Sequence, residues 1–224
     1  MTSLLPAAVL WDMDGTLVDT EPYWLAAEAE LVASFGGTWT HEDGMTLVGS
    51  GLWHAAGILQ HRGVDLTEDD IVNRLTDRVM EQIASGVSWR PGALELLAEL
   101  RDAGIPTALV TMSIRRMADH VASFIPFAAF DHIVSGDSVT HSKPHPEPYL
   151  RSAELLGVDA AECVAIEDST TGLASAVAAG AVAIGVPLHS PLEHGRGYTI
   201  WPSLAGRRLA DVSELFRSPR TDAA

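Results

Sequence analysis

The chain has 224 residues, of which 47% are hydrophobic, so it is long enough to bury one large domain, or one domain with a small insert. Its formal net charge of −16 argues against a nucleic-acid partner or an anionic membrane surface, because no basic region stands out. A single cysteine, Cys163, excludes a disulfide framework and favours a reducing compartment. The sequence has no signal-peptide pattern and no apolar run of about 20 residues, so we expect a cytoplasmic protein.

Short, continuous apolar runs recur along the chain, and several end in polar residues. The first covers residues 7–11, directly before Asp12. Runs of this kind are typical of strands that are buried on both faces of a parallel sheet. The further runs cover residues 106–110, 132–134, 163–166 and 181–186. The segment 187–198 is predicted to be a loop after the last of these strands.

Segments with helical periodicity separate the apolar runs. They cover residues 94–100, 114–121, 149–156 and 173–177, and a glycine follows three of them at positions 104, 157 and 180. Ser113 is expected to cap the second helix. Strands that alternate with helices through short connections predict an α/β protein with a doubly wound, Rossmann-like parallel sheet.

The segment from about residue 21 to residue 88 shows helical periods without intervening strands. Apolar residues share a face within residues 24–35, 52–59 and 71–83, and a capping signal precedes the last of these stretches. We therefore expect a core of residues 1–19 and 89–224 and an inserted helical cap of residues 20–88. The tail after Phe216 is expected to be disordered.

Two aspartates follow the first predicted strand directly, in the sequence Asp-Met-Asp-Gly-Thr at residues 12–16. Residues two apart in a strand point the same way, so Asp12 and Asp14 should project together at the C-terminal end, where parallel sheets bind ligands. Neighbouring carboxylates repel each other unless a cation or a shared proton relieves them, and oxygen ligands suit Mg²⁺. Gly15 allows a tight turn and a close backbone approach to a ligand. An ordinary turn after a strand is the alternative.

A second acidic pair, Glu167 and Asp168, ends another predicted strand, where neither a turn nor a helix cap requires two charges. If the two strands are neighbours, these carboxylates complete a hard-metal site with Asp12 and Asp14. Alternatively, Asp168 or Ser169 only caps the helix that follows. Both functions can hold for different residues.

Two further positions have side chains that could hold an anionic phosphate. Thr111 ends a strand at the start of a helix, where a hydroxyl and free N–H groups can bind phosphate, and Ser113 either assists or caps the helix. Lys143 lies in a loop with prolines at positions 144, 146 and 148, which would hold its charge in place. A solvent-exposed lysine is the usual alternative, but the rigid loop and the other motifs favour a role in the site.

The order of these motifs resembles that of the haloacid dehalogenase superfamily of phosphatases: residues 12–16, then Thr111, then Lys143-Pro144, then Glu167-Asp168. The helical insertion resembles the small α-helical cap of that family, and the match extends from residue 8 to about residue 216. The most similar subgroup contains phosphoglycolate-type phosphatases, sugar phosphatases and β-phosphoglucomutase.

The resemblance implies roles for the four acidic residues. Asp12 would be the nucleophile that forms an aspartyl-phosphate. Asp14 would protonate the leaving alkoxide and then deprotonate the attacking water. Asp12, the backbone carbonyl of Asp14, and Asp168 would bind Mg²⁺, with Glu167 acting directly or through water.

The resemblance also implies the contacts to substrate. Thr111 and Lys143 would hold the transferring phosphoryl group, with Ser113 and Gly49 as further substrate-binding residues. The metal and Lys143 together would offset the charge of a phosphate monoester. The expected partner is a small phosphorylated metabolite, and the expected assembly is a monomer or a weak homodimer.

Departures from β-phosphoglucomutase favour hydrolysis over mutase chemistry. In that enzyme a cap histidine stands where this chain has Trp24, and a cap lysine and an arginine help to hold a second phosphate around a stretch resembling residues 47–52. No basic residue lies at those places here, so a bisphosphate intermediate would be harder to hold. Trp24 and Trp53 either line a pocket for an aromatic or sugar group or belong to the cap core.

Two other functions fit the motifs less well. Dehalogenation in this superfamily needs no metal, so Asp14 and the pair Glu167-Asp168 argue against it. A non-catalytic regulator of the same fold would most easily lose Asp12, Asp14 or Lys143, and all three are present. The sequence therefore predicts a Mg²⁺-dependent phosphatase.

Overall fold

The strands follow the apolar runs of the sequence and form one parallel sheet. The computed structural model describes residues 5–84, 86–194 and 196–218. Within them the strands are β1 (Ala8–Trp11), β2 (Thr107–Val110), β3 (His132–Val134), β4 (Cys163–Glu167), β5 (Val182–Gly185) and β6 (Tyr198–Ile200). Their order in the sheet is β3-β2-β1-β4-β5-β6, and every neighbouring pair is parallel. The chain thus runs outward in both directions from β1 and β4.

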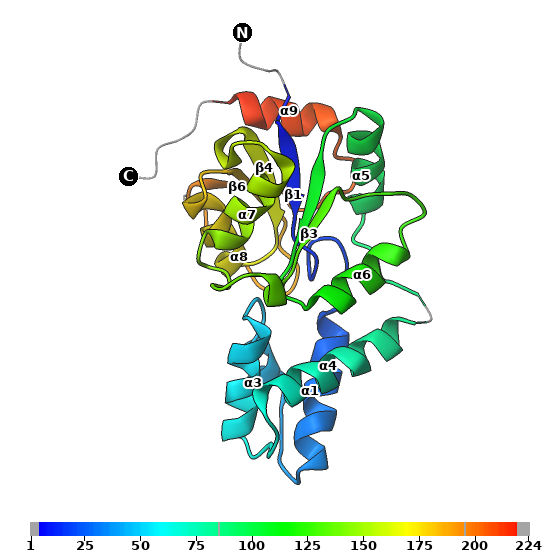
Figure 1. The fold of residues 1–224 in the computed structure, drawn as a ribbon, viewed down its shortest axis with the longest axis vertical. Coiled ribbons are helices and arrows are strands. Elements are labelled where there is room, and N and C mark those ends of the chain that lie inside the picture. Colours follow the sequence, from blue (N-terminus) through cyan, green and yellow to red (C-terminus); the bar gives the residue numbers. More distant parts are fainter. Residues whose placement is uncertain (1–4, 85, 195, 219–224) are drawn as a thin grey trace.

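Helices cover both faces of this sheet (Figure 1). Val9 and Trp11 of β1 pack into a cluster with α5 (Ala93–Asp102), α6 (Arg115–Ser123) and α9 (Leu209–Arg217). Ala8 and Leu10, which alternate with them, pack on the opposite face with α7 (Glu147–Leu156) and α8 (Thr170–Ala178). Because alternate residues of a strand enter opposite clusters, the buried runs need apolar side chains at every position. The predicted doubly wound α/β fold is confirmed.

Four helices between β1 and α5 form a separate group beyond the C-terminal ends of the strands, which we call the cap (Figure 1). They are α1 (Glu21–Ser34), α2 (His41–Met45), α3 (Leu52–His61) and α4 (Glu68–Ile83). Helix α4 packs against both α1 and α3. Its side chains Ile71, Leu75, Val79 and Ile83 are buried at intervals of four residues, which gives one apolar face.

Two antiparallel segments connect the core to the cap. Val18 pairs with Trp89 in a β-bridge, and the Asp19 N–H donates to the Ser88 carbonyl over 2.8 Å. The Arg90 side chain, which is buried, donates to the carbonyl oxygen of Gly15. This arginine therefore ties the turn after β1 to the segment that returns from the cap.

Several details of the sequence prediction need correction. Ser113 does not cap α6, because Ile114 occupies the N-cap position and the Ser113 hydroxyl is bonded elsewhere. The predicted loop 187–198 overlaps the edge strand β6, which has three residues and no buried run to reveal it. The prediction also lacked α2 and α9, and two short 3-10 helices, Gly136–Ser138 and Ala160–Glu162. In the tail predicted to be disordered, Arg217 ends α9, and residues 219–224 lie outside the described residues.

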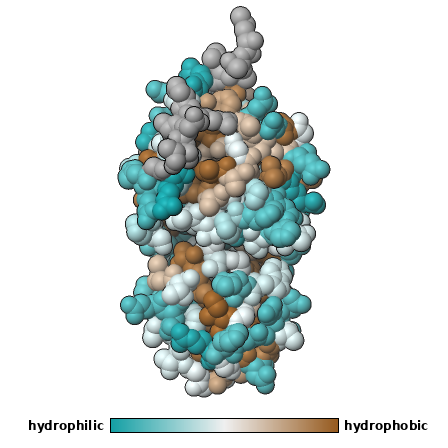
Figure 2. All heavy atoms as spheres, turned by 90° about the vertical axis from the view of Figure 1, so that its left-hand side faces the viewer, coloured by the Kyte–Doolittle hydropathy of each residue, from teal (hydrophilic) through white to brown (hydrophobic). Residues whose placement is uncertain are grey.

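The face of the molecule that Figure 2 shows is mixed in character. Figure 2 shows hydrophobic residues in separate groups between hydrophilic ones, in both the core and the cap. Among the described residues, every helix is too short or too polar to cross a lipid bilayer.

Candidate active site

The predicted site residues meet at the middle of the sheet, where β1 and β4 lie side by side. Asp12 follows β1, Glu167 ends β4 and Asp168 follows it. Thr111 follows β2, the neighbour of β1 on the other side. This is the point at which the strand order reverses, and open parallel sheets bind ligands beyond the C-terminal ends of strands at such a point.

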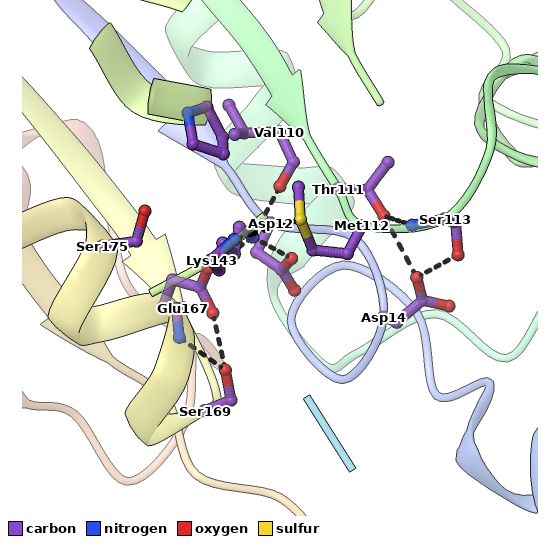
Figure 3. A network of polar contacts seen from close by, with 12 residues as sticks. Asp12, Asp14, Val110, Thr111, Met112, Ser113, Lys143, Glu167, Ser169 and Ser175 are labelled. Carbon is purple, nitrogen blue, oxygen red and sulfur yellow. Dashed lines mark hydrogen bonds and ion pairs between the residues drawn. The ribbon is translucent and has the colours of Figure 1, made fainter. Parts of the chain in front are cut away.

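Lys143 reaches this point from the loop between β3 and α7. Its Nζ lies 2.7 Å from Asp12 Oδ1 and 2.6 Å from Glu167 Oε1, and it donates to the Val110 carbonyl over 2.8 Å (Figure 3). Only 6% of the residue is exposed, so the alternative of a solvent-exposed lysine is wrong. Burial opposes its charge, but Asp12 and Glu167 raise the pKa of Lys143 above its ordinary value.

Asp12, Glu167 and Asp168 form a buried acidic group. Each offers a carboxylate oxygen, and these atoms lie within 4.8 Å of one another. Burial and the charge of Glu167 raise the pKa of Asp12 to about 8, and burial and the charge of Asp12 raise the pKa of Asp168 well above its ordinary value. One lysine cannot offset three carboxylates at this distance.

The residues present fit a hard divalent cation. Asp12 Oδ2 is buried and accepts no hydrogen bond from any residue that the structure describes. Oxygen ligands of this kind suit Mg²⁺, and a bound dication would offset the burial and the excess negative charge that raise the two aspartate pKa values. Asp12, Asp168 and Glu167 are the side chains that would hold it.

Two glycines make room for these carboxylates. Gly15 has a φ of +85°, and a Cβ there would lie 2.1 Å from Asp168 Oδ2. Gly172, in the first turn of α8, would place a Cβ 2.0 Å from Glu167 Oε1. Both distances are far below a normal contact, so any larger residue would displace an acid of the site. Only Gly15 was recognised from the sequence, where it belongs to a motif.

The carboxylate of Asp14 does not join the acidic group. Its Oδ1 accepts hydrogen bonds from Thr20 Oγ1 at 2.5 Å and Trp24 Nε1 at 3.2 Å. Its Oδ2 accepts from Ser113 Oγ at 2.8 Å and Thr111 Oγ1 at 3.2 Å, as Figure 3 shows. These four hydrogen bonds hold the Asp14 side chain away from the acidic group, so its backbone carbonyl is the atom of Asp14 that stays predicted as a metal ligand.

A pocket between the core and the cap opens over these residues. It encloses about 700 Å³ of space between atoms, part of it open to solvent. The core contributes Asp12, Asp14, Met112, Ser113, Lys143, Asp168 and Ser169. The cap contributes Glu21, Trp24, Glu28, Leu47, Val48, Gly49, Ser50, Leu52 and Ala55.

For several residues the sequence allowed both a structural role and a role in the site, and the structure assigns these residues differently. Ser169 caps α8, since its Oγ accepts the Gly172 N–H over 3.0 Å, whereas Asp168 faces the pocket. Trp24 lines the pocket and is also a buried residue of the cap core. Trp53 is not among the pocket residues, and its Nε1 donates to Asp69 Oδ1 over 2.8 Å.

Comparison with known proteins agrees with this geometry. A model of the haloacid dehalogenase-like hydrolase family matches residues 6–180. The chain belongs to this family. Hexitol phosphatase B of Escherichia coli is 31% identical over 93% of this chain and 93% of its own length. Protein CbbY of Rhodobacter capsulatus is 37% identical over 92% of this chain and 93% of its own length.

A solved structure shows the same similarity in three dimensions. CbbY from Rhodobacter sphaeroides, in complex with xylulose-(1,5)bisphosphate, matches with a TM-score of 0.84 at 30% identity. The match covers 93% of this chain and 99% of that chain. The predicted family is confirmed, and the chain is an enzyme of the haloacid dehalogenase-like phosphatase type.

Several residues that shape this haloacid dehalogenase-like site were not recognised from the sequence. Tyr149 donates its hydroxyl to Glu167 Oε1 over 2.6 Å, and Thr20 holds Asp14. Glu21 and Glu28 line the cap side of the pocket. Glu21 follows the first motif closely, which was an available signal, whereas Tyr149 and Glu28 lie in ordinary helical patterns that carry none.

Proposed function

We propose that this enzyme hydrolyses a small phosphate monoester in a Mg²⁺-dependent reaction, with Asp12 as the nucleophile. The observation that carries the proposal is the hydrogen bonding of the two Asp12 carboxylate oxygens. Lys143 fixes Oδ1, while the buried Oδ2 has no hydrogen-bond partner in the described chain, and the residue lines the pocket. An oriented carboxylate with one free oxygen beside a cationic group is suited to nucleophilic attack on phosphorus.

In the first step a carboxylate oxygen of Asp12 would attack phosphorus, and the bond from phosphorus to the leaving oxygen would break. Asp14, carrying a proton, would donate it to that oxygen and release an alcohol. Thr20, Trp24 and Ser113 all donate to the Asp14 carboxylate, which supports a fixed position for this acid.

In the second step water would attack the phosphorus of the aspartyl-phosphate. Asp14, now a carboxylate, would accept a proton from that water as the bond between phosphorus and Asp12 breaks, which releases inorganic phosphate and restores the enzyme. Lys143 and Thr111 would keep the phosphoryl oxygens in place during both steps. Mg²⁺ held by Asp12, Glu167, Asp168 and the Asp14 carbonyl would supply positive charge opposite the phosphoryl group.

The ligands of the named relatives differ, since the CbbY structure holds a bisphosphate and hexitol phosphatase B is named for a hexitol. By its name, hexitol phosphatase B acts on a phosphorylated sugar alcohol, and we propose a substrate of similar size here. Lys143 is the one basic side chain among the described pocket residues, which supports hydrolysis over a mutase that must hold a bisphosphate.

The proposal includes the organisation of the chain. Residues 1–19 and 89–224 would form the catalytic core, and residues 20–88 would form a cap that closes over the substrate and excludes water. A cytoplasmic location also belongs to the proposal, supported by the one cysteine, which is free and buried. A monomer or a weak homodimer stays a prediction.

Phosphate release from a panel of small phosphate monoesters, with Mg²⁺ and with a chelator, tests this function. We expect release that depends on Mg²⁺ and is concentrated on a few substrates. Asp12→Asn should lower kcat by at least about 10³-fold, because the amide is a poor nucleophile. Unimpaired turnover by this variant, or equal turnover with the chelator, would refute the mechanism.

A further inference from the structure

Two glutamates of α1 lie on the cap side of the pocket, opposite the phosphate site. Glu21 and Glu28 are seven residues apart, about two helical turns, so they lie on one face of the helix. Both line the pocket, and Glu28 is only 6% exposed. Carboxylates are rarely buried without a partner, so their positions call for a chemical reason.

The Glu28 carboxylate has one hydrogen bond within the described chain. Trp39 Nε1 donates to Oε2 over 3.1 Å, and Oε1 accepts none. Among the described residues of the cap, no cation is close enough to influence its pKa. Arg62 pairs with Asp43 and lies over the Trp39 ring, and Arg78 pairs with Glu30 on the outer side of the cap. Glu28 therefore presents an unpaired acceptor oxygen close to the ligand space.

The charge of the pocket is strongly one-sided. Lys143 is the one basic residue among the described lining residues, and it is already bonded to Asp12 and Glu167. The acidic lining residues are Asp12, Asp14, Glu21, Glu28 and Asp168. A cation at the core can match the phosphate that reacts, but the described lining residues of the cap include no basic side chain to match a second anion.

We propose that Glu28 accepts a hydrogen bond from a hydroxyl of the leaving group and, together with Glu21, excludes substrates that carry a second anionic group. The substrate class is then the monophosphate of a neutral sugar or polyol, and sugar acids and bisphosphates are rejected. This inference rests on the proposed phosphatase function and adds the chemistry of the leaving group.

The raised pKa values of Glu28 and Glu21 set the pH above which these two side chains are anionic. Burial raises the pKa of Glu28 to about 7, although the bond from Trp39 opposes the rise. Burial and the charge of Glu28 raise the pKa of Glu21 to about 8. A pocket in which carboxylates already ionise with difficulty will resist another anion, whereas hydroxyl donors favour the ionised form.

A pair of substrates that differ in one group provides the test. Glucitol 6-phosphate and 6-phosphogluconate share a chain of hydroxylated carbons and a terminal phosphate, and differ in a CH₂OH or a carboxylate at the far end. In assays near pH 9, above the raised pKa values of both glutamates, we expect kcat/KM for the first to exceed that for the second by ~30-fold or more, since like charges in contact are strongly unfavourable. In Glu28→Gln the ratio should fall to about threefold, mainly through a lower KM for 6-phosphogluconate.

Two controls keep the outcomes distinct. Glu30→Gln removes an exposed acid of the same helix that does not line the pocket, and it should keep the wild-type ratio. Hydrolysis of p-nitrophenyl phosphate reports the core chemistry separately. If this compound is hydrolysed but the two hexose derivatives react equally, or if Glu28→Gln keeps the full ratio, the inference is wrong and the phosphatase function stands. If no substrate is hydrolysed, the proposed function itself fails.

Discussion

The buried carboxylate of Glu28 should make the folded protein less stable as the pH rises. Its pKa is raised from an ordinary 4.5 to about 7, so the folded state binds this proton more tightly than the unfolded state does. The contribution of this tighter proton binding to the free energy of unfolding is fully present below about pH 4.5 and is lost as the pH rises through about 7. The difference between 4.5 and about 7 corresponds to about 3 kcal/mol at high pH.

Glu28→Gln removes this penalty and keeps an oxygen that can accept the Trp39 hydrogen bond. We expect the variant to be more stable than the wild type by up to about 3 kcal/mol near pH 8, and equally stable near pH 4.5. Urea unfolding followed by tryptophan fluorescence, with chelator present throughout, measures both values. Trp24 and Trp39 lie in the cap, and Trp11 and Trp201 lie in the core, so the fluorescence follows the unfolding of both parts.

Glu30→Gln is the matched control, because Glu30 is exposed and its hydrogen bond with Arg78 lowers its pKa. This variant should show no gain in stability at any pH. A Glu28→Gln variant whose stability advantage is the same near pH 5 and near pH 8 would refute the reasoning, since a packing change does not titrate. A loss of stability near pH 8 would refute it as well.

Two further predictions concern the core. Gly172→Ala should lower kcat/KM at least about tenfold, because the new methyl group displaces the Glu167 carboxylate. Gly57→Ala in α3 is the control and should leave activity unchanged, because a Cβ there meets only an ordinary contact at 3.5 Å. Equal activities in steady-state assays would show that the position of Glu167 is unimportant. Asp14→Asn should release about one equivalent of nitrophenolate from p-nitrophenyl phosphate in a burst, because this leaving group needs no proton. Its steady-state turnover should then be at least ~10²-fold slower than that of the wild type, because the attacking water needs a base. A linear time course at the wild-type rate in stopped-flow measurements would contradict the role of Asp14.

The sequence alone predicted the fold class and the main members of the site. Strands buried on both faces require uninterrupted apolar runs, and helices with one buried face require a period near 3.6, so both kinds of element leave a readable pattern. Charged residues such as Asp12 and Glu167, placed directly after such runs, stand out because no local structure needs them. The three-residue edge strand β6 has no such pattern, and it was missed.

The tertiary structure determined which of these groups face one another. Residues at the ends of separate strands become neighbours only through the order of the sheet, so the pairing of Lys143 with both Asp12 and Glu167 is a tertiary result. The separation of the Asp14 carboxylate from the acidic group depends on hydrogen bonds from two segments far apart in the chain, the start of α1 and the loop after β2. Glu28 differs from a solvated helix residue only because the cap places its face over the pocket. Local patterns record which side of a helix is apolar, but the position of that helix above a site depends on packing between segments far apart in the chain.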